Sequence, residues 1–524
     1  MSFFDENFST NVCKSLAKEK ITVSLKDVYN CLKKFHLSDG LYQIGLILAA
    51  LEKIQIHKKE IPSRIIKWIS HAKTVGQHEV SLRVNFTNMA RFLILSGSND
   101  YKGEKLTVDH PSFIDAYNMV SNLYDEKITT PSELNAHFAR IAQKQFMIQP
   151  PSMAGIIGRG HLLFLQIPSE IKCNYDFDAK LKSYHRIGIL EFIASGFCEW
   201  VSSTGAVVER RIEVEKLKLL ATDYNRQIFR NLSSGKAKKY REYIRGPEYD
   251  KKKGIINKSS EIHGPEPFFL MPLIEVERSD IKGLRYVVPQ PIYLLYRATL
   301  GIFNILADQE MSSGKEQNNF RIEFGNVYEH YVGKLLSTVK DPSLFIRLGT
   351  EVKGFPDFAI IEDSICILFE VKLTILDLET RTLFREDKIK KEIESGHIGK
   401  AIKQFNNFER IFDELRSEDS RFKNVKKIMK IIVGFDEIFN INHVLLPKIK
   451  DIHGEKFGEN LQIASITDLE ILAGFLSSDE GSLNKVVQKL TEPDCYFWSF
   501  QGYLTSLGHP ILNAACDEFL RKII

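Results

Sequence analysis

The sequence predicts an α+β multidomain protein in which a helical N-terminal region precedes an α/β domain with a mixed central sheet. The 524 residues, 44% of them hydrophobic and 26% charged, have the composition of globular proteins and a length typical of about three or four domains. Apolar residues recur at helical spacing in residues 1–150. After residue 319, short apolar runs alternate with amphipathic segments, as expected for strands that pack against helices.

The first 150 residues carry signals for helices and for their N-termini. Leu25, Val28 and Leu32 follow Ser24 at helical spacing, and serine is a favoured residue at the start of a helix. The run Thr130-Pro131-Ser132-Glu133 has the pattern of a capping box with proline at the first helical position. No repeat of fixed period is present, so we expect a packed helical domain rather than a solenoid.

Residues 151–319 give mixed signals. A glycine-rich run at Gly155–Gly160 lacks the spacing of a dinucleotide-binding loop; it can clamp a nucleic-acid backbone, but a turn is the simpler expectation. A basic segment at 236–258 has Tyr240 and Tyr243 among its charges and can track phosphates and stack bases, although an exposed loop has the same composition. Its candidate nucleic-acid-binding residues are Lys236, Lys238, Lys239, Arg241, Lys251, Lys252 and Lys253.

From residue 320 onward, the expected elements are those of an α/β domain that extends to residue 480. They are a helix at 324–336, strands at 344–348, 357–361 and 365–371, a helix at 393–415, strands at 428–435 and 461–466, and a helix at 468–476. This order predicts a mixed sheet that is covered by helices. Residues 481–524 are expected to form a C-terminal helical extension.

Three ionisable residues lie at the ends of two neighbouring strands of this domain. Glu370 and Lys372 occupy positions i and i+2 of one strand, so their side chains project to the same face. The five preceding residues, 365–369, are apolar, which indicates a strand that is covered on both faces. Charged groups at the end of such a strand are costly unless they are paired or bind a metal. A short hairpin brings Asp357 alongside them.

The chemistry of this group suits a divalent metal. Two carboxylates and a main-chain carbonyl form a set of hard oxygen ligands for Mg²⁺ or Mn²⁺. Such a metal polarises a phosphoryl oxygen and lowers the pKa of its bound water, while a nearby ammonium offsets charge that builds up on phosphorus. We therefore assign Asp357 and Glu370 as metal ligands, Val371 as a carbonyl ligand and Lys372 as an electrostatic helper.

Pro356-Asp357 and Glu370-Val371-Lys372 resemble the two signature positions of the PD-(D/E)XK nuclease superfamily, which includes restriction enzymes, resolvases and RecB-type nucleases. The resemblance covers residues 320–470 and implies a restriction-endonuclease-like fold and a Mg²⁺-dependent endonuclease that hydrolyses DNA. It further implies a metal-binding acid on the preceding helix, which Glu329 fits, and a catalytic glutamine on the following helix, which Gln404 fits. Chains of this layout resemble bacterial restriction and anti-phage effectors.

Several alternatives stay open at this point. Asp341-Pro342 and Glu351-Val352-Lys353 form a rival motif whose flank is less apolar, and an ordinary salt bridge at a strand end accounts for the favoured residues without catalysis. The domain can also be a catalytically silent module that binds nucleic acid or another partner. A nuclease directed at RNA or at branched junctions has the same motif.

Composition and apolar patterning indicate in which compartment the protein is expected and which partners it can have. No apolar run reaches the ~20 residues of a membrane helix, and the N-terminus lacks the apolar core of a secretion signal. The seven cysteines include no closely spaced pair. We therefore expect a cytoplasmic protein with no membrane partner, and the sequence leaves open whether it forms a homo-oligomer. The net charge of +4 restricts any DNA-binding surface to a local patch.

Overall fold

A computed structural model of the chain describes residues 23–51, 62–74, 79–98, 103–123, 136, 152–171, 173–203, 215–245, 267–276, 286–312, 319–349, 354–377, 380–381, 384–438, 441–454, 457, 460–492, 495–504 and 508–524. The chain divides into two compact units, and each is built from segments that are separated in the sequence. The first contains Met1–Lys127, Leu181–Ile305 and Lys522–Ile524, and the second contains Ile128–Lys180 and Leu306–Arg521. Neither unit coincides with one of the consecutive segments expected from the sequence.

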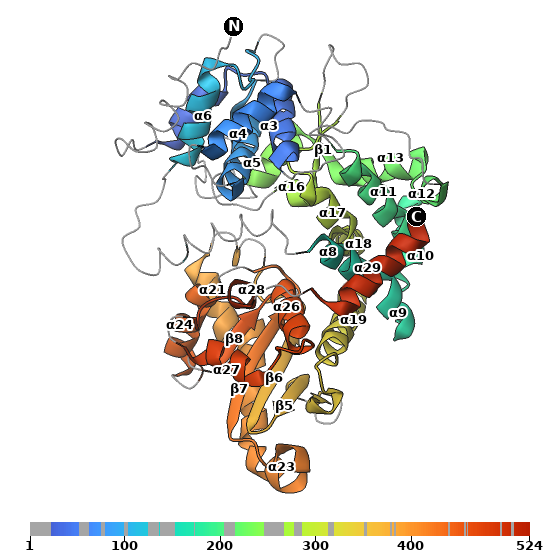
Figure 1. Cartoon of the computed structure of the whole chain (residues 1–524), viewed down its shortest axis with the longest axis vertical. Coiled ribbons are helices and arrows are strands. Elements are labelled where there is room, and N and C mark those ends of the chain that lie inside the picture. Colours follow the sequence, from blue (N-terminus) through green and yellow to red (C-terminus); the bar gives the residue numbers. More distant parts are fainter. Residues whose placement is uncertain are drawn as a thin grey trace. The chain divides into compact units, whose positions relative to one another are not determined.

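The first unit is mainly helical. Its helices are α2 (Leu25–Leu32), α3 (Leu37–Leu51), α4 (Ser63–Thr74), α5 (Glu79–Ser96), α6 (Pro111–Ser121), α11 (Ile189–Val201), α12 (Glu215–Leu220), α13 (Asp223–Ser233), α14 (Ala237–Arg245), α16 (Pro267–Leu270) and α17 (Ile292–Ala298) (Figure 1). The prediction for α2 is confirmed, because Ser24 caps it in a reciprocal capping box with Asp27. The Thr130–Glu133 run lies outside the described residues.

A small sheet accompanies these helices. It contains β1 (Ser234–Lys236), β2 (Leu273–Glu275) and β3 (Tyr286–Val287), with β1 parallel to β2 and β3 antiparallel to it. Among the described residues, no helix combines the length and the apolar character that crossing a membrane would require.

The second unit contains a five-stranded sheet in the order β4-β5-β6-β7-β8. The strands are β4 (Phe345–Arg347), β5 (Phe358–Glu362), β6 (Ile365–Lys372), β7 (Lys427–Gly434) and β8 (Leu461–Ala464). The first two pairings are antiparallel, and the pairings of β6 with β7 and of β7 with β8 are parallel. The predicted mixed sheet is therefore confirmed, with strand ends within a few residues of those expected.

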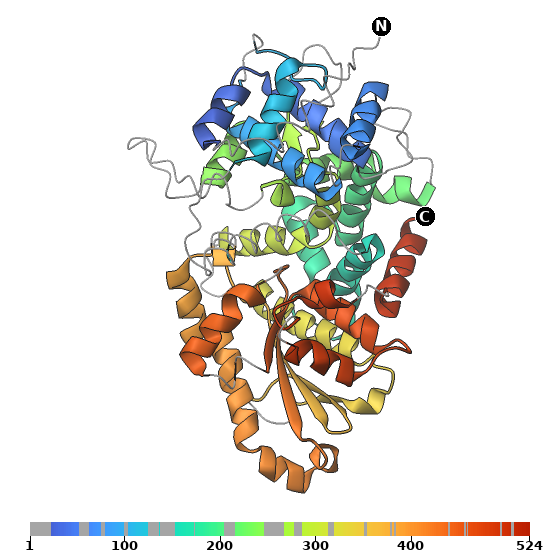
Figure 2. The ribbon, with the colours of Figure 1, turned by 60° about the vertical axis from the view of Figure 1, so that its left-hand side comes forward.

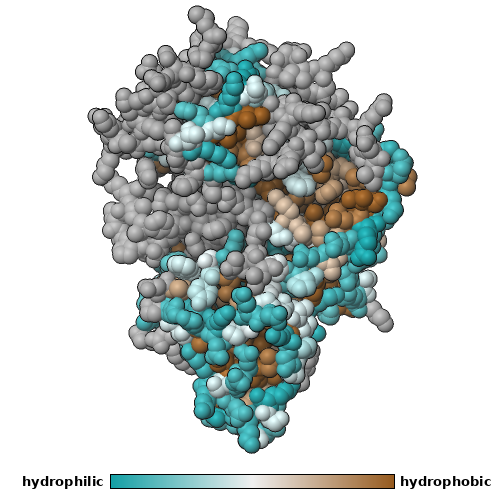
Figure 3. All heavy atoms as spheres, in the orientation of Figure 1, coloured by the Kyte–Doolittle hydropathy of each residue, from teal (hydrophilic) through white to brown (hydrophobic). Residues whose placement is uncertain are grey.

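Helices cover both faces of this sheet (Figure 2). Helix α19 (Asn319–Leu336) precedes the strands, α24 (Asn442–His453) lies between β7 and β8, and α26 (Ile466–Leu476), α27 (Leu483–Thr491), α28 (Phe500–Tyr503) and α29 (Pro510–Ile523) follow them. Helices α10 (Phe177–His185) and α18 (Gly301–Ser312) each contain a point at which the chain passes between the units, and α29 contains another between Arg521 and Lys522. In Figure 3, hydrophilic residues predominate around the end of the second unit at which α23 (Phe412–Glu418) lies.

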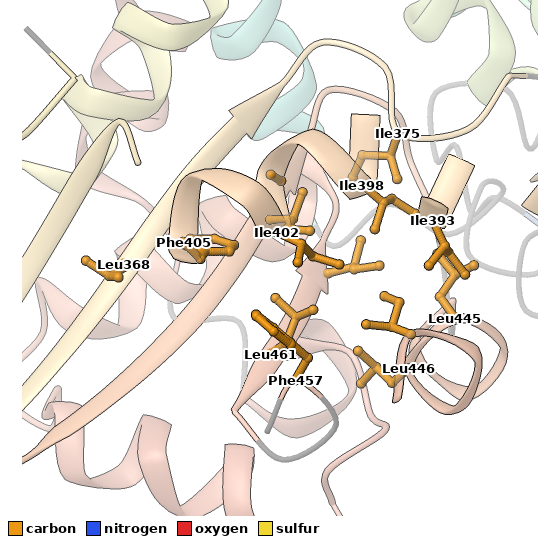
Figure 4. Packing of buried hydrophobic residues seen from close by; sticks show 14 of the residues in the cluster. Leu368, Ile375, Ile393, Ile398, Ile402, Phe405, Leu445, Leu446, Phe457 and Leu461 are labelled. Atoms are coloured by element: carbon orange, nitrogen blue, oxygen red, sulfur yellow. The ribbon is translucent and has the colours of Figure 1, made fainter. Parts of the chain in front are cut away.

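The single helix predicted for residues 393–415 is wrong, because three helices occupy this region. Helix α21 (Glu386–Glu394) ends at Ser395, α22 (His397–Arg410) begins after Gly396, and α23 follows a second break at Ile411. The first break arises where the Glu392 carboxylate accepts a hydrogen bond from the His397 N–H (2.9 Å). The inner face of α22 nevertheless matches the prediction, since Ile398, Ile402 and Phe405 gather with Leu368 of β6 and Leu461 of β8 (Figure 4).

The turn predicted at Gly155–Gly160 is also wrong, because these residues form most of α8 (Met153–His161). Ser152 caps this helix by accepting a hydrogen bond from the Gly155 N–H (2.9 Å). A Cβ atom at Gly158 would clash with the main-chain carbonyl of Leu512 in α29. Glycine is therefore required for the close approach of the two helices, and it does not mark a loop.

Candidate active site

The hairpin between β5 and β6 determines how the predicted acids meet. Its loop is Asp363-Ser364, and the pairing Phe358↔Phe369 in the ladder places Asp357 next to Glu370 one step beyond it. Residues that lie opposite each other on paired strands project to the same face of a sheet. Asp357 and Glu370 therefore share the face that α22 covers, and Lys372 joins them two residues further along β6.

Asp357 is held from two sides. Its Oδ2 accepts a hydrogen bond from the Val371 N–H of β6 (2.7 Å). Its main-chain carbonyl accepts hydrogen bonds from the N–H groups of Leu348 (2.9 Å) and Gly349 (3.2 Å), which follow β4. The half-buried carboxylate is thus fixed at the junction of three strands, with its other oxygen left for a further partner.

Glu370 is the most buried member of the group, with an exposed fraction of 1%. Its Oε1 forms an ion pair with the Lys372 ammonium. Its Oε2 is buried and has no hydrogen-bond partner within the described part of the chain. A buried carboxylate oxygen without a partner is expensive, which marks this position as one that an additional ligand would stabilise.

Helix α22 supplies the fourth predicted residue. Gln404 accepts a hydrogen bond from Lys372 Nζ through its Oε1 (2.9 Å) and donates one from Nε2 to the Phe355 carbonyl (3.0 Å). One turn later, Asn407 donates to the carbonyl of Gly354 (3.2 Å), whose φ of +92° only glycine adopts easily. Asn407 was not predicted from the sequence, although its spacing of three residues from Gln404 places both on one side of the helix.

Burial and charge repulsion shift the pKa values of both acids. Burial raises the pKa of Glu370 to about 8; the charge of Asp357 adds to this, and Lys372 and the Gln404 amide offset only part of it. Burial likewise raises the pKa of Asp357 to about 6, although the Val371 N–H lowers it and the charge of Glu329 raises it. A divalent cation would stabilise both carboxylates in their ionised forms.

The donor set fits a divalent metal in part. Among the described residues, no three histidine, cysteine, aspartate or glutamate side chains gather into a ready metal site. The group instead offers the carboxylates of Asp357 and Glu370, the partnerless Oε2 of Glu370, and the main-chain carbonyl of Val371 between them in the sequence. Oxygen ligands of this kind suit Mg²⁺, which keeps several of its water ligands when it binds to proteins.

Glu329 does not join this group. Its carboxylate pairs with Arg347 (3.2 Å), whose guanidinium lies over the Phe358 ring, 5.5 Å from the ring centroid. Phe358 projects from β5 toward Gly333 of α19, on the face opposite to that of Asp357. Glu329 and Arg347 line a polar pocket of about 340 Å³ together with Ile171, Cys173, Asn174, Glu323, Asn326 and His330. Glu329 therefore acts on Asp357 through its charge and not as a neighbour in the same cluster.

Part of the basic segment of the first unit packs within the fold instead of forming an exposed surface. Tyr240 is buried and donates to the carbonyls of Met271 (2.6 Å) and Leu273 (2.8 Å), so the expectation that it stacks on bases is wrong. Arg241 donates to the Ile94 carbonyl and thereby anchors α14 to α5. Exposed cations are Lys236, Lys238 and Lys239, while Lys251, Lys252, Lys253 and the rival Glu351-Val352-Lys353 lie outside the described residues.

A second group of buried carboxylates, which was not predicted from the sequence, lies in the same unit. Arg159 of α8, 2% exposed, donates from Nε and Nη2 to the two oxygens of Glu470 (2.6 Å each) and from Nη1 to Glu437 (2.8 Å). Thr467 accepts a hydrogen bond from Arg159 Nη2 (2.8 Å), and the Tyr331 hydroxyl donates to Glu470. Both oxygens of Glu470 are thus satisfied.

Comparison of the chain with models of protein families, with curated proteins and with solved structures gave no match.

Proposed function

We propose that the protein is a metal-dependent endonuclease that hydrolyses phosphodiester bonds of DNA, in restriction or anti-phage defence, and that residues 320–470 have a restriction-endonuclease-like fold. The observation that carries the proposal is the cross-strand group of Asp357, Glu370 and Lys372, with one oxygen of Glu370 buried and without a partner among the described residues. Perturbed acids beside a fixed ammonium are typical of catalytic sites. The mixed sheet between α19 and α22 supports the fold assignment.

In this proposal, Asp357, Glu370 and the Val371 carbonyl hold a Mg²⁺ or Mn²⁺ ion. When bound, the ion supplies a Lewis acid for a phosphoryl oxygen and a water of lowered pKa. Lys372 places a positive charge beside the same carboxylates, where it opposes negative charge that develops on the phosphate. The Glu370 carboxylate already forms an ion pair with the Lys372 ammonium. A cation bound to Glu370 would weaken this ion pair and leave the ammonium available to the substrate.

Gln404 and Asn407 act as positioning residues. Gln404 joins the Lys372 ammonium to the Phe355 carbonyl, and Asn407 holds the turn at Gly354 that leads into Asp357. The two amides of α22 therefore fix the lysine and the aspartate relative to each other. Catalytic groups must be held within a fraction of an ångström, and such supporting hydrogen bonds supply that precision.

Cleavage of supercoiled plasmid with Mg²⁺ tests the proposal. Asp357→Asn and Lys372→Met should each reduce the cleavage rate by at least about a hundredfold, because the first removes a ligand of the metal and the second removes the ammonium that opposes charge on the phosphate. Asp363→Asn is the matched control: it removes an acid from the hairpin loop, where φ is +54° and asparagine is well tolerated. Cutting at the wild-type rate by either folded variant would contradict the assignment.

A catalytically silent binding module is the second candidate. It is favoured by the ion pair that Lys372 already makes with Glu370. Calorimetric titration with Mg²⁺ separates the two candidates. A module would bind DNA without taking up the metal, whereas the nuclease would bind the metal at Asp357 and Glu370. A nuclease directed at RNA would instead cut an RNA substrate in the plasmid assay.

A further inference from the structure

We propose that the outer face of α22 binds the phosphate backbone of double-stranded DNA and directs it to Lys372. The contact residues are Lys400, Lys403 and Arg410, which we call the α22 cationic stripe. The inference rests on the proposed nuclease function and adds to it the surface that holds the substrate.

Helix geometry puts the stripe on the side of α22 opposite to the core. Ile398, Ile402 and Phe405 point into the hydrophobic core on one side of the helix (Figure 4). At about 100° per residue, Lys400 and Lys403 project away from them, and Arg410 repeats the position of Lys403 two turns later. All three cations are exposed, in agreement with this geometry.

The stripe carries charge that the protein itself does not neutralise. Within the part of the chain that the structure describes, Lys400, Lys403 and Arg410 make no hydrogen bond or ion pair. Other lysines of the unit behave differently, since Lys340 pairs with Asp479 (3.1 Å) and Lys448 pairs with Glu386 (2.7 Å).

The one acid of α22 does not compensate the stripe. Glu409 turns toward the buried Lys430 (2.6 Å). Like charges three and four residues apart on a helix repel each other. A surface of this kind is stabilised when a polyanion covers it.

The position of the stripe connects it to the candidate active site. Lys400 lies one turn before Gln404, which accepts a hydrogen bond from Lys372 Nζ (2.9 Å). The stripe spans eleven residues, and its ends lie about 15 Å apart along the helix, which corresponds to about four base pairs of duplex. Acidic residues begin on α23 with Asp413 and Glu414, and they mark the end of the surface that suits phosphate. A duplex strand that follows the stripe therefore arrives beside Lys372.

The salt dependence of DNA binding tests this surface without any cleavage. Binding of the full-length protein to a fluorescent 20-base-pair duplex is measured by anisotropy in EDTA over a range of salt concentrations. Replacing Lys400, Lys403 and Arg410 together by glutamine should make the slope of log K against log salt less steep by about 2 to 3, because each lost phosphate contact contributes about 0.9. The charge-matched control replaces Lys340, Lys448 and Lys485, which are engaged with Asp479, Glu386 and the Glu480 carbonyl, and should keep the wild-type slope.

The outcomes separate this inference from the nuclease proposal. A stripe variant that keeps the wild-type slope, or a wild-type protein that does not bind the duplex, overturns the inference. A control that loses as much slope as the stripe variant overturns it as well, because net charge alone would then account for binding. Loss of slope in the stripe variant alone supports the stripe even if the wild-type protein fails to cut DNA with Mg²⁺, in which case only the nuclease proposal falls. Tighter binding to single-stranded RNA than to the duplex would overturn the choice of DNA.

Discussion

Glu370 and Glu470 are both buried glutamates of the second unit, and they differ in the hydrogen-bond and ion-pair partners of their carboxylate oxygens. Glu470 receives two hydrogen bonds from Arg159 and one from Tyr331, so both of its oxygens have partners. Glu370 receives Lys372 on one oxygen, and its other oxygen has no partner in the described part of the chain. Burial raises the pKa of both groups; Arg159 and Tyr331 oppose this shift at Glu470, and Lys372 opposes it at Glu370.

Glu470 is thus a carboxylate whose oxygens are both paired within the fold, whereas in the proposed function Glu370 is one that a metal ligand would complete. The Arg159–Glu470 pair joins α8 to α26 and would leave an unpaired buried charge if either partner were removed. Glu370 already has one buried oxygen without a hydrogen-bond partner in the described part of the chain. The same substitution should therefore lower the free energy of unfolding much more at Glu470 than at Glu370.

The largest expected effect is on stability. Glu470→Gln should lower the free energy of unfolding by about 3–5 kcal/mol, because it breaks a buried pair and leaves Arg159 undercompensated. Glu370→Gln should lower it little or raise it, since the amide avoids the cost of burying a negative charge. Urea denaturation of the two metal-free variants measures both values. Equal losses in the two variants would remove the distinction between the sites.

A smaller effect is expected when Mg²⁺ is added. At a metal concentration about 100 times its dissociation constant, a ligand that binds only the folded protein raises the free energy of unfolding by about 2.7 kcal/mol. We expect this stabilisation in the wild-type protein and in Asp363→Asn, and not in Glu370→Gln. Thermal melts with and without Mg²⁺ provide the measurement, and an equal rise in Glu370→Gln would place the metal elsewhere.

The smallest effect is the pH dependence of stability in the metal-free protein. The pKa of Glu370 is raised to about 8 in the folded state, so the folded protein keeps a proton that the unfolded chain has already lost near neutral pH. Its stabilising contribution is complete below the unfolded pKa and declines as pH rises through the folded pKa. Between about pH 6.5 and about pH 7.5, above the pKa of about 6 of Asp357, the wild-type protein should lose up to about 1.4 kcal/mol relative to Glu370→Gln. Parallel pH profiles for the two proteins would show that Glu370 titrates normally.

Much of the candidate site was predictable because its information is local. The apolar run of β6 followed by Glu370 and Lys372, and a two-residue hairpin back to Asp357, lie within sixteen residues of sequence, and a strand alternates its faces with a fixed period. Gln404 was implied by the resemblance of the motif to the nuclease superfamily, and α22 brings it to Lys372. Boundaries such as Gly396 and Ile411 were missed, since apolar periodicity continues across both breaks.

The remaining features depend on contacts between distant residues. Glu329 was expected at the metal, but Arg347 and the placement of Phe358 hold it on the other face of the sheet. Gly158 appeared to be a turn residue because its close neighbour, Leu512, lies more than three hundred residues away in the chain. No pattern in the sequence around Arg159 or around Glu470 indicates that they pair, and only the fold of the unit brings them together.

The pairing of Arg159 with Glu470 has a consequence for how the protein is made. These residues are separated by 311 positions, so at about 5–20 residues per second a ribosome needs about 15 to 60 s after Arg159 to deliver its partner. During that interval the strands of Asp357, Glu370 and Lys372 are already emerging while α8 still lacks its anchor. A chain that terminates before Glu470 would therefore keep Arg159 without its bidentate partner, and the second unit can complete this buried pair only after Glu470 has been made.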